Sequence, residues 1–206
     1  MSSSRYYEEL AAAFVRGRLG NAAATIDDGL RAGLRLHKFK ADATLARVQK
    51  VLGILRAVGP ESLLDVGSGR GTFLWPLLDA FPGLAVTSID ISDQRILDLR
   101  AVRDGGVTRL TPVLANAQEM PFAGGSFDVV TMLEVLEHMV DPQAALTRAV
   151  AVARRFVILS VPSVPDDNPE HIHLFSVDDL RHMADVAGAR RVTIDHVLNH
   201  RIAVLQ

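Results

Sequence analysis

The segment LEVLEHMVDP carries ionisable side chains of two kinds directly after the apolar run FDVVTM. Glu134, Glu137 and His138 fall within five residues, and His171 and His173 follow in PEHIHLF. An imidazole titrates near neutral pH, so His138 could remove a proton from an acceptor group. Carboxylates and imidazoles together also form the mixed oxygen and nitrogen ligand set that suits Mg²⁺, Mn²⁺ or Fe²⁺. Either chemistry requires a fold that brings these residues to one place.

The elements that would position these residues are short apolar runs separated by helical segments. Expected strands cover 62–67, 84–90, 109–115, 127–132 and 155–162, and expected helices lie between them at 71–81, 92–104 and 141–153. Apolar strands that alternate with helices predict a parallel sheet covered on both faces. A further helix over 176–189 starts with the capping pair Ser176 and Asp179, and 190–206 reads as two strands with a short turn.

Residues 5–56 are expected to be helical, including a stretch from about Thr25 to Lys40. They carry ten Lys/Arg and five Asp/Glu, whereas the remainder carries twelve and nineteen. An anionic partner would therefore meet the N-terminal part, unless these charges simply form a solvated helical face. We expect residues 1–56 to form a helical cap or lid over a domain of residues 57–206. Four aromatic residues of this cap either line an acceptor pocket or pack the helices onto the sheet: Tyr6, Tyr7, Phe14 and Phe39.

Composition places the chain among globular proteins. Its 206 residues are 49% apolar and contain no cysteine, which excludes disulfides and thiolate metal sites. Acidic residues near the N-terminus and the lack of an apolar run of about 18 residues predict a cytoplasmic protein without a membrane partner. The net charge of −2 gives no general signal for nucleic acid, and aromatic residues are few at 5%.

A glycine-rich turn follows the first expected strand in LLDVGSGRGTFL. Gly67, Gly69 and Gly71 alternate with other residues, Asp65 precedes them, and Asp90 ends the second strand. Alternating glycines let the backbone approach a ligand, and an acid at the end of the second strand can bind ribose hydroxyls. The spacing differs from the G-x-G-x-x-G of dinucleotide sites, and Asp65 would repel a phosphate but suit a cationic amino group.

The combination of these residues with Asn116 and the strand FDVV resembles the class I S-adenosylmethionine-dependent methyltransferases over about residues 60–206. The resemblance implies an α/β, three-layer, doubly wound fold, with a mostly parallel seven-stranded sheet whose last strand is antiparallel. It also implies S-adenosylmethionine as cofactor. The cofactor-binding residues implied by the resemblance are Asp65, Gly67, Gly69, Gly71, Asp90, Ile91, Asn116, Ala117 and Glu134.

The pattern E-x-x-E-H with a downstream histidine is similar to two metal-using branches of this family. These are the small-RNA 3′-terminal ribose 2′-O-methyltransferases and the ubiquinone-pathway O-methyltransferases. This resemblance implies a Mg²⁺ or Mn²⁺ site formed by Glu134, Glu137, His138 and His173. The alternative needs no ion: Glu134 orients the cofactor, and His138 acts as a base or simply packs.

Three functions are consistent with the sequence. The first is methylation of a small-molecule acceptor, with a hydroxyl favoured over nitrogen or carbon, and with Glu134 and His138 as catalytic candidates. The second is metal-dependent methylation of an RNA 3′ end, against which the acidic C-terminal part and scarce aromatics argue. The third is a non-catalytic cofactor-binding subunit that acts on a partner. The oligomeric state is left open by the sequence.

Overall fold

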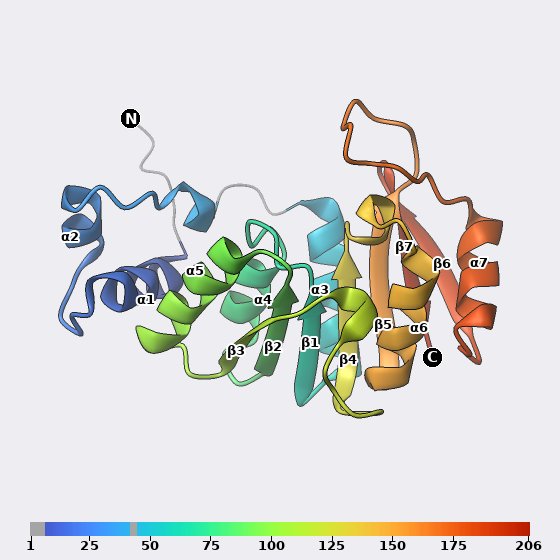
Figure 1. Cartoon of the computed structure of the whole chain (residues 1–206), viewed down its shortest axis with the longest axis horizontal. Coiled ribbons are helices and arrows are strands. Elements are labelled where there is room, and N and C mark those ends of the chain that lie inside the picture. Colours follow the sequence, from blue (N-terminus) through green and yellow to red (C-terminus); the bar gives the residue numbers. More distant parts are fainter. Residues whose placement is uncertain (1–6, 42–44) are drawn as a thin grey trace.

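The computed structural model, which describes residues 7–41 and 45–206, is built on one seven-stranded sheet with the order β3-β2-β1-β4-β5-β7-β6 (Figure 1). The strands are β1 Ser62–Val66, β2 Ala85–Asp90, β3 Leu110–Leu114, β4 Phe127–Leu133, β5 Ala153–Pro162, β6 Val192–Val197 and β7 His200–Leu205. Strand β7 runs antiparallel to both β5 and β6, while β1 to β5 pair in parallel. The predicted fold class, including the antiparallel last strand, is confirmed.

Helices cover both faces of the sheet and give three layers (Figure 1). One face packs against α3 Ala46–Val58, α4 Leu74–Ala80 and α5 Asp93–Asp104, and the other against α6 Pro142–Val152 and α7 Val177–Val186. Successive strand residues point to opposite faces, so Leu63 belongs to the first core cluster and Leu64 to the second. Within 7–41 and 45–206 we find no helix that combines the length and the apolar character needed to cross a bilayer.

The strand order reverses between β1 and β4, and this places the ligand crevice. In open α/β sheets, connections leave in opposite directions at such a point and open a crevice beyond the carboxyl ends of the strands. The described residues also include short 3₁₀ helices: η1 His37–Phe39, η2 Ala117–Glu119 after β3, and η3 Leu136–His138 after β4. The segment LEVLEH therefore begins at the carboxyl end of a central strand.

The N-terminal segment is less helical than the sequence predicts. Helix α1 covers Glu8–Leu19, but the stretch from Thr25 to Lys40 forms only α2 Ile26–Arg31 and η1. Gly33 has a φ of +77°, a left-handed conformation that a continuing helix could not contain. The prediction of a helical stretch over Thr25–Lys40 is therefore wrong beyond α2.

Aromatic residues of this segment lie in the core. Phe39 is fully buried, with its ring centroid 5.2 Å from that of Phe14 and 4.8 Å from that of Trp75. Tyr7 is partly buried against the same cluster, and Tyr6 lies outside the described residues. Phe14 and Phe39 thus pack the N-terminal segment against Trp75 of α4 in the core, and α1 lies against α5. The role of residues 1–56 as a lid stays a prediction.

The start of α7 is fixed by a capping box, as the sequence predicts. The Ser176 hydroxyl accepts a hydrogen bond from the Asp179 backbone N–H, and the Asp179 carboxylate accepts one from the Ser176 backbone N–H. Ser176→Ala is expected to lower the free energy of unfolding by about 1 kcal/mol, because one helix N–H loses its acceptor. Ser176→Gly should cost only a few tenths, since glycine tolerates the cap conformation and admits water. Equal losses in urea denaturation of the two variants would contradict this account of the cap.

Candidate active site

A cavity of about 740 Å³ opens at the carboxyl ends of β1, β2 and β4. It extends from Asp90 at the end of β2, past the glycine-rich turn, to Glu134 and His138 after β4. Seven of the nine residues predicted to bind the cofactor line it: Gly67, Gly69, Asp90, Ile91, Asn116, Ala117 and Glu134. Of the other two, Asp65 lines a neighbouring hollow of about 140 Å³. Gly71 lines neither space.

The glycine-rich turn owes its shape to left-handed backbone. Gly67, Gly69 and Gly71 have φ values of +77°, +53° and +83°, which side-chain-bearing residues rarely adopt. A Cβ on Gly67 would lie 2.7 Å from Val135, and one on Gly71 would lie 2.0 Å from the Trp75 indole nitrogen. Gly71 therefore serves the packing of Trp75 beneath the turn, while Gly67 and Gly69 present backbone to the cavity.

Asp90 ties the glycine-rich turn to the end of β2. Its carboxylate accepts hydrogen bonds from the Ser68 hydroxyl (3.0 Å), the Gly69 N–H (3.1 Å) and the Ser92 N–H (2.9 Å), and the Arg95 guanidinium lies 3.3 Å away. The residue is only 4% exposed, yet it lines the cavity. A charged acceptor held in this way is suited to vicinal hydroxyls of a ligand.

Asn116 and Ala117 begin η2 at the far end of the cavity. The Asn116 side-chain oxygen accepts the Gln118 N–H at 3.0 Å and caps the 3₁₀ helix. The same oxygen has a second lone pair that could accept a hydrogen bond from an amino group of a ligand. Exposed Ile91 lies across the same cavity and offers an apolar surface for a flat ring.

Asp65 lies almost fully buried beneath the turn. The Thr131 hydroxyl donates to its carboxylate at 3.0 Å and the Ser88 hydroxyl at 3.3 Å. Burial nevertheless raises the pKa of Asp65 to about 7, because these hydrogen bonds only partly replace the lost hydration. Arg47, from the first turn of α3, lines the same small hollow. The hollow thus combines a guanidinium with two carboxylates, Asp65 and Glu134.

Glu134 follows β4 in a conformation unusual for its type. Its φ is +56°, and its carboxylate accepts from the Ser160 hydroxyl at 2.7 Å. His200 Nε2 lies 3.0 Å from the other carboxylate oxygen, and Arg47 Nε lies 3.7 Å from the first. Strained backbone of this kind persists where surrounding contacts fix it, and it is common at functional sites. Glu134 lines both the cavity and the hollow.

Arg47, Ser160 and His200 are site residues that the sequence interpretation missed. They come from α3, β5 and β7, which are separated from Glu134 by 87, 26 and 66 positions. Ser160 lies near the carboxyl end of a predicted parallel strand, and this position could have indicated it. No motif marks Arg47 or His200.

Glu137 is fully buried in η3. Its carboxylate oxygens have no hydrogen-bond partner among the residues that the structure describes. Its backbone carbonyl, in contrast, accepts from the N–H groups of Ile172 and His173, at 2.9 and 3.3 Å. Burial, and secondarily the charge of Glu134, raise the pKa of Glu137 to about 8. A buried carboxylate without partners requires a proton or a cation.

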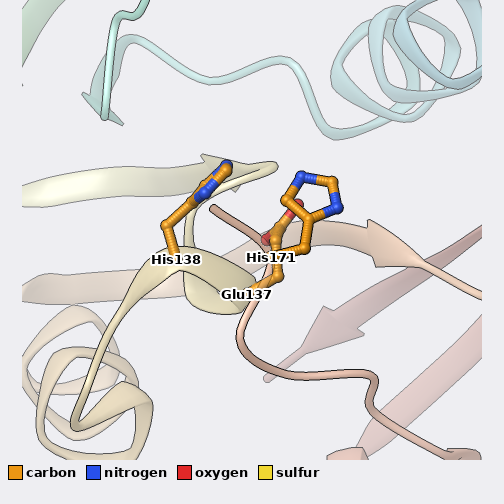
Figure 2. A group of neighbouring side chains, drawn as sticks. All are labelled: Glu137, His138 and His171. Atoms are coloured by element: carbon orange, nitrogen blue, oxygen red, sulfur yellow. The ribbon is translucent and has the colours of Figure 1, made fainter. Parts of the chain in front are cut away.

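Two imidazoles lie beside this carboxylate (Figure 2). One ligand atom each of Glu137, His138 and His171 lies within 4.8 Å of the others. His138 and Glu137 project from the turn after β4, and His171 from the loop that crosses beside it (Figure 2). The His138 Nδ1 lies 3.0 Å from the Glu170 carbonyl and the His171 Nδ1 lies 2.8 Å from an Asp166 carboxylate oxygen. Because a carbonyl can only accept, His138 Nδ1 carries a proton, so in the neutral ring Nε2 holds the lone pair.

The four residues predicted as metal ligands are not gathered as a set. Glu137 and His138 lie together with His171, whereas Glu134 is engaged by Ser160 and His200. His173 Nε2 lies 2.9 Å from the Met139 carbonyl, outside this group.

Comparison with known proteins finds methyltransferases. Residues 64–155 match a family model described as a methyltransferase domain. A malonyl-(acyl-carrier protein) O-methyltransferase of Geobacter sulfurreducens is 32% identical over 110 residues, which are 52% of this chain and 39% of that protein. A ubiquinone biosynthesis O-methyltransferase of Bordetella parapertussis is 34% identical over 122 residues, which are 56% of this chain and 47% of that protein. The chain spans about half or less of the length of these relatives.

Solved structures show the same fold. A methyltransferase from Aquifex aeolicus described as SAM-dependent has a TM-score of 0.63 at 20% identity, covering 79% of this chain and 89% of that one. The magnesium protoporphyrin IX methyltransferase of Synechocystis, with bound SAH, has a TM-score of 0.61 at 21% identity, covering 78% and 82%. Residues 64–155 thus resemble a methyltransferase domain, and the sheet shares the fold of these solved methyltransferases.

Proposed function

We propose that the chain is an enzyme that methylates a hydroxyl group of a small-molecule acceptor with S-adenosylmethionine. The observation that carries this proposal is the place of His138 in the lining of the same cavity as Glu134 and Asp90, with its Nδ1 engaged by the Glu170 carbonyl. An unprotonated imidazole nitrogen at this place suits removal of a hydroxyl proton. O-methyltransferases among the curated relatives support the choice of oxygen as acceptor.

The residues present fit the cofactor. We assign the ribose hydroxyls to Asp90, the adenine to Ile91, Asn116 and Ala117, and the methionine part to the backbone of Gly67 and Gly69. The left-handed turn, and the place of Gly67 and Gly69 in the lining of the cavity, support this assignment. Bound there, the cofactor supplies a methyl group carried on a sulfonium. The chain's own task is then to position the acceptor and to take its proton.

The hollow beside the turn suits the amino-acid end of the cofactor. Asp65 and Glu134 supply negative charge for an ammonium, and Arg47 supplies a guanidinium for a carboxylate. At 3.7 Å, the Arg47 contact with Glu134 is longer than a hydrogen bond, so the guanidinium keeps donors for a ligand.

Arg47→Gln is expected to weaken binding of S-adenosylhomocysteine about tenfold, because a charge-assisted hydrogen bond is lost. Binding of 5′-methylthioadenosine, which lacks the amino-acid end, should stay unchanged. Both are measured by calorimetric titration, with Arg56→Gln on the exposed face of α3 as the matched control. An equal loss for both ligands would contradict the assignment of Arg47.

A divalent cation offers a second way to activate the acceptor at the same place. We propose Glu137, His138 and His171 as its ligands, in a set that differs from the predicted one by including His171 in place of Glu134 and His173. The orphaned Glu137 carboxylate supports this choice, as does the engagement of both Nδ1 atoms, which leaves Nε2 of each ring for coordination. A cation held there would lower the pKa of a bound hydroxyl.

Titration of Mn²⁺ into chelator-treated protein tests the cation site. Glu137→Gln and His171→Ala are each expected to weaken binding by about tenfold or more, whereas the control His182→Ala on exposed α7 should not. A loss with His173→Ala but not with His171→Ala would instead support the set predicted from the sequence. Absence of Mn²⁺ binding to the wild type would leave His138 as the proton acceptor without an ion.

Methyl transfer itself is tested with methyl-labelled S-adenosylmethionine and a panel of phenols, catechols and a 3′-hydroxyl RNA oligonucleotide. We expect transfer to small hydroxyl acceptors, and a loss of about 100-fold in kcat with His138→Gln. Failure to bind S-adenosylhomocysteine would overturn the enzyme proposal. Binding without transfer to any acceptor would favour the non-catalytic alternative, and transfer only to the oligonucleotide would favour the RNA alternative.

A further inference from the structure

Large apolar side chains are exposed around the mouth of the crevice. Val140 after η3, Val164, Ile172 and Leu174 in the loop after β5, and Leu198 in the β6–β7 turn are 89%, 43%, 53%, 48% and 83% exposed. We call these five residues the apolar rim. Figure 1 shows that the loop stands above the carboxyl end of β5, next to η3 and the turn of the β6–β7 hairpin. Apolar groups that gather on one exposed face mark a binding surface more often than chance.

Hydrogen bonds hold the segments of the rim together. The Ser163 N–H donates to the Asn199 carbonyl at 2.8 Å and joins the loop to the hairpin turn. The Ile172 N–H donates to the Glu137 carbonyl at 2.9 Å and joins the loop to η3. His171 and Phe175 turn inward along the loop, so Ile172 and Leu174 point to solvent. The backbone hydrogen bonds therefore hold Ile172 and Leu174 in exposed positions.

Leu198 adds an independent observation. Its φ of +50° is left-handed, in a two-residue hairpin turn where asparagine or glycine is the usual residue. A leucine here strains the backbone and gains no burial, since it is 83% exposed. Within the free protein, no burial of the Leu198 side chain offsets the strain of its backbone. A ligand that covers Leu198 would supply this burial and would account for a leucine at this position.

The charges nearby indicate what covers the rim. The same loop carries Asp166, Asp167 and Glu170, all exposed, and these carboxylates repel phosphate-bearing surfaces such as RNA or an anionic bilayer. Val140 belongs both to the rim and to the lining of the cofactor cavity, next to His138. The rim is therefore continuous with the place where the acceptor hydroxyl would lie.

We propose that the apolar rim binds an uncharged hydrocarbon portion of the methyl acceptor, such as an alkyl, isoprenoid or acyl chain, while its hydroxyl reaches His138. This inference rests on the proposed function, and it names the substrate class as amphiphilic small molecules. The chain of such an acceptor lies over Val140 and extends toward Ile172 and Leu198.

Binding of 4-alkylphenols tests the rim without turnover. Phenol and its propyl, pentyl and heptyl derivatives are titrated into the full chain, with and without S-adenosylhomocysteine. Wild-type affinity is expected to rise about twofold to fourfold per methylene, as for burial of apolar surface. The variant Ile172→Ser/Leu174→Ser/Leu198→Asn should lose about tenfold for heptylphenol and little for phenol. Leu30→Ser/Leu97→Ser, at exposed leucines away from the crevice, is the control and should bind like the wild type.

Leu198→Asn alone sharpens the test, because asparagine suits the left-handed turn. It is expected to raise the thermal midpoint and yet to weaken heptylphenol binding. An affinity that does not depend on chain length in the wild type, or that depends on it equally in the rim variant, would overturn the proposal. If the wild type shows the chain-length dependence but neither binds S-adenosylhomocysteine nor transfers a methyl group, the proposed function is rejected. The rim would then remain an apolar binding site.

Discussion

The free energy of unfolding of Glu137→Gln, relative to that of the wild type, is expected to rise by about 2 kcal/mol between pH 6 and pH 8 in chelator-treated protein. The pKa of this carboxyl rises from 4.5 to about 8 on folding, because the side chain is buried without a hydrogen-bond partner among the described residues. Glutamine keeps the shape and cannot ionise. The pH-dependent part of the difference is therefore the free energy that the wild type loses as Glu137 is held protonated in the folded state.

The sign follows from proton binding. Between pH 4.5 and about 8 the folded state binds more protons at Glu137 than the unfolded state does, so stability falls as the pH rises. Full stability from this group is present below the unfolded pKa, and it is lost as the pH approaches the folded pKa. The charged groups that act on Glu137 are Glu134 and Asp166, which raise its pKa, and Arg47, which lowers it.

Urea denaturation of both proteins at pH 6 and pH 8 measures this effect. The exposed Glu119→Gln is the control, and its effect should be small at both pH values. A benefit of Glu137→Gln that is the same at pH 6 and pH 8 would contradict the raised pKa. Added Mn²⁺ should stabilise the wild type at pH 8 and not the variant, because a cation at this site favours the ionised carboxylate.

Asp90→Asn is expected to weaken binding of S-adenosylhomocysteine by about 100-fold or more. Charged hydrogen bonds contribute about 1.5–3 kcal/mol each, and we assign two ribose hydroxyls to this carboxylate. The same oxygens also accept from Ser68, Gly69 and Ser92, so an amide would turn donors toward the N–H groups of the turn. Both effects act in the same direction.

Calorimetric titration compares Asp90→Asn with Asp93→Asn, which alters an exposed carboxylate in the first turn of α5. Asp93→Asn should bind as the wild type does. Binding of adenine alone should be almost unchanged in Asp90→Asn, because the base is assigned to Ile91 and Asn116. A change of less than about fivefold for S-adenosylhomocysteine would show that Asp90 shapes the turn without contacting the ligand.

The part of the fold that could be predicted is the part where local pattern and tertiary structure agree. Apolar strands such as FDVVTM, with glycines or capping residues at their ends, fix a parallel sheet and the direction of its crevice. The stretch Thr25–Lys40 was misjudged because its composition allows helix, while Gly33 and the packing of Phe39 decide against it. Burial of one aromatic side chain outweighs a few residues of helix propensity.

The site residues that could be predicted are likewise those that lie close together in the sequence. Glu134, Glu137 and His138 are close in sequence, so their spacing alone brings them to one turn. The partners of Glu134 are distant, and only the pairing of β5 with β7 brings Ser160 and His200 together. His171 and His173 are both half-buried, and it is the course of the loop that brings His171 to Glu137 and His138 but His173 to the Met139 carbonyl. A family pattern without loop geometry cannot decide this.

The position of β7 has a consequence for how the protein folds during its synthesis. It is the last strand along the chain, yet it lies inside the sheet between β5 and β6 and brings His200 to Glu134. During synthesis, β1 to β5 can pair as they emerge, but Glu134 acquires its full set of contacts only when the final hairpin inserts. Assembly of the crevice is therefore coupled to completion of the sheet, and an unfinished chain keeps the side of β5 that β7 covers as an open edge for pairing.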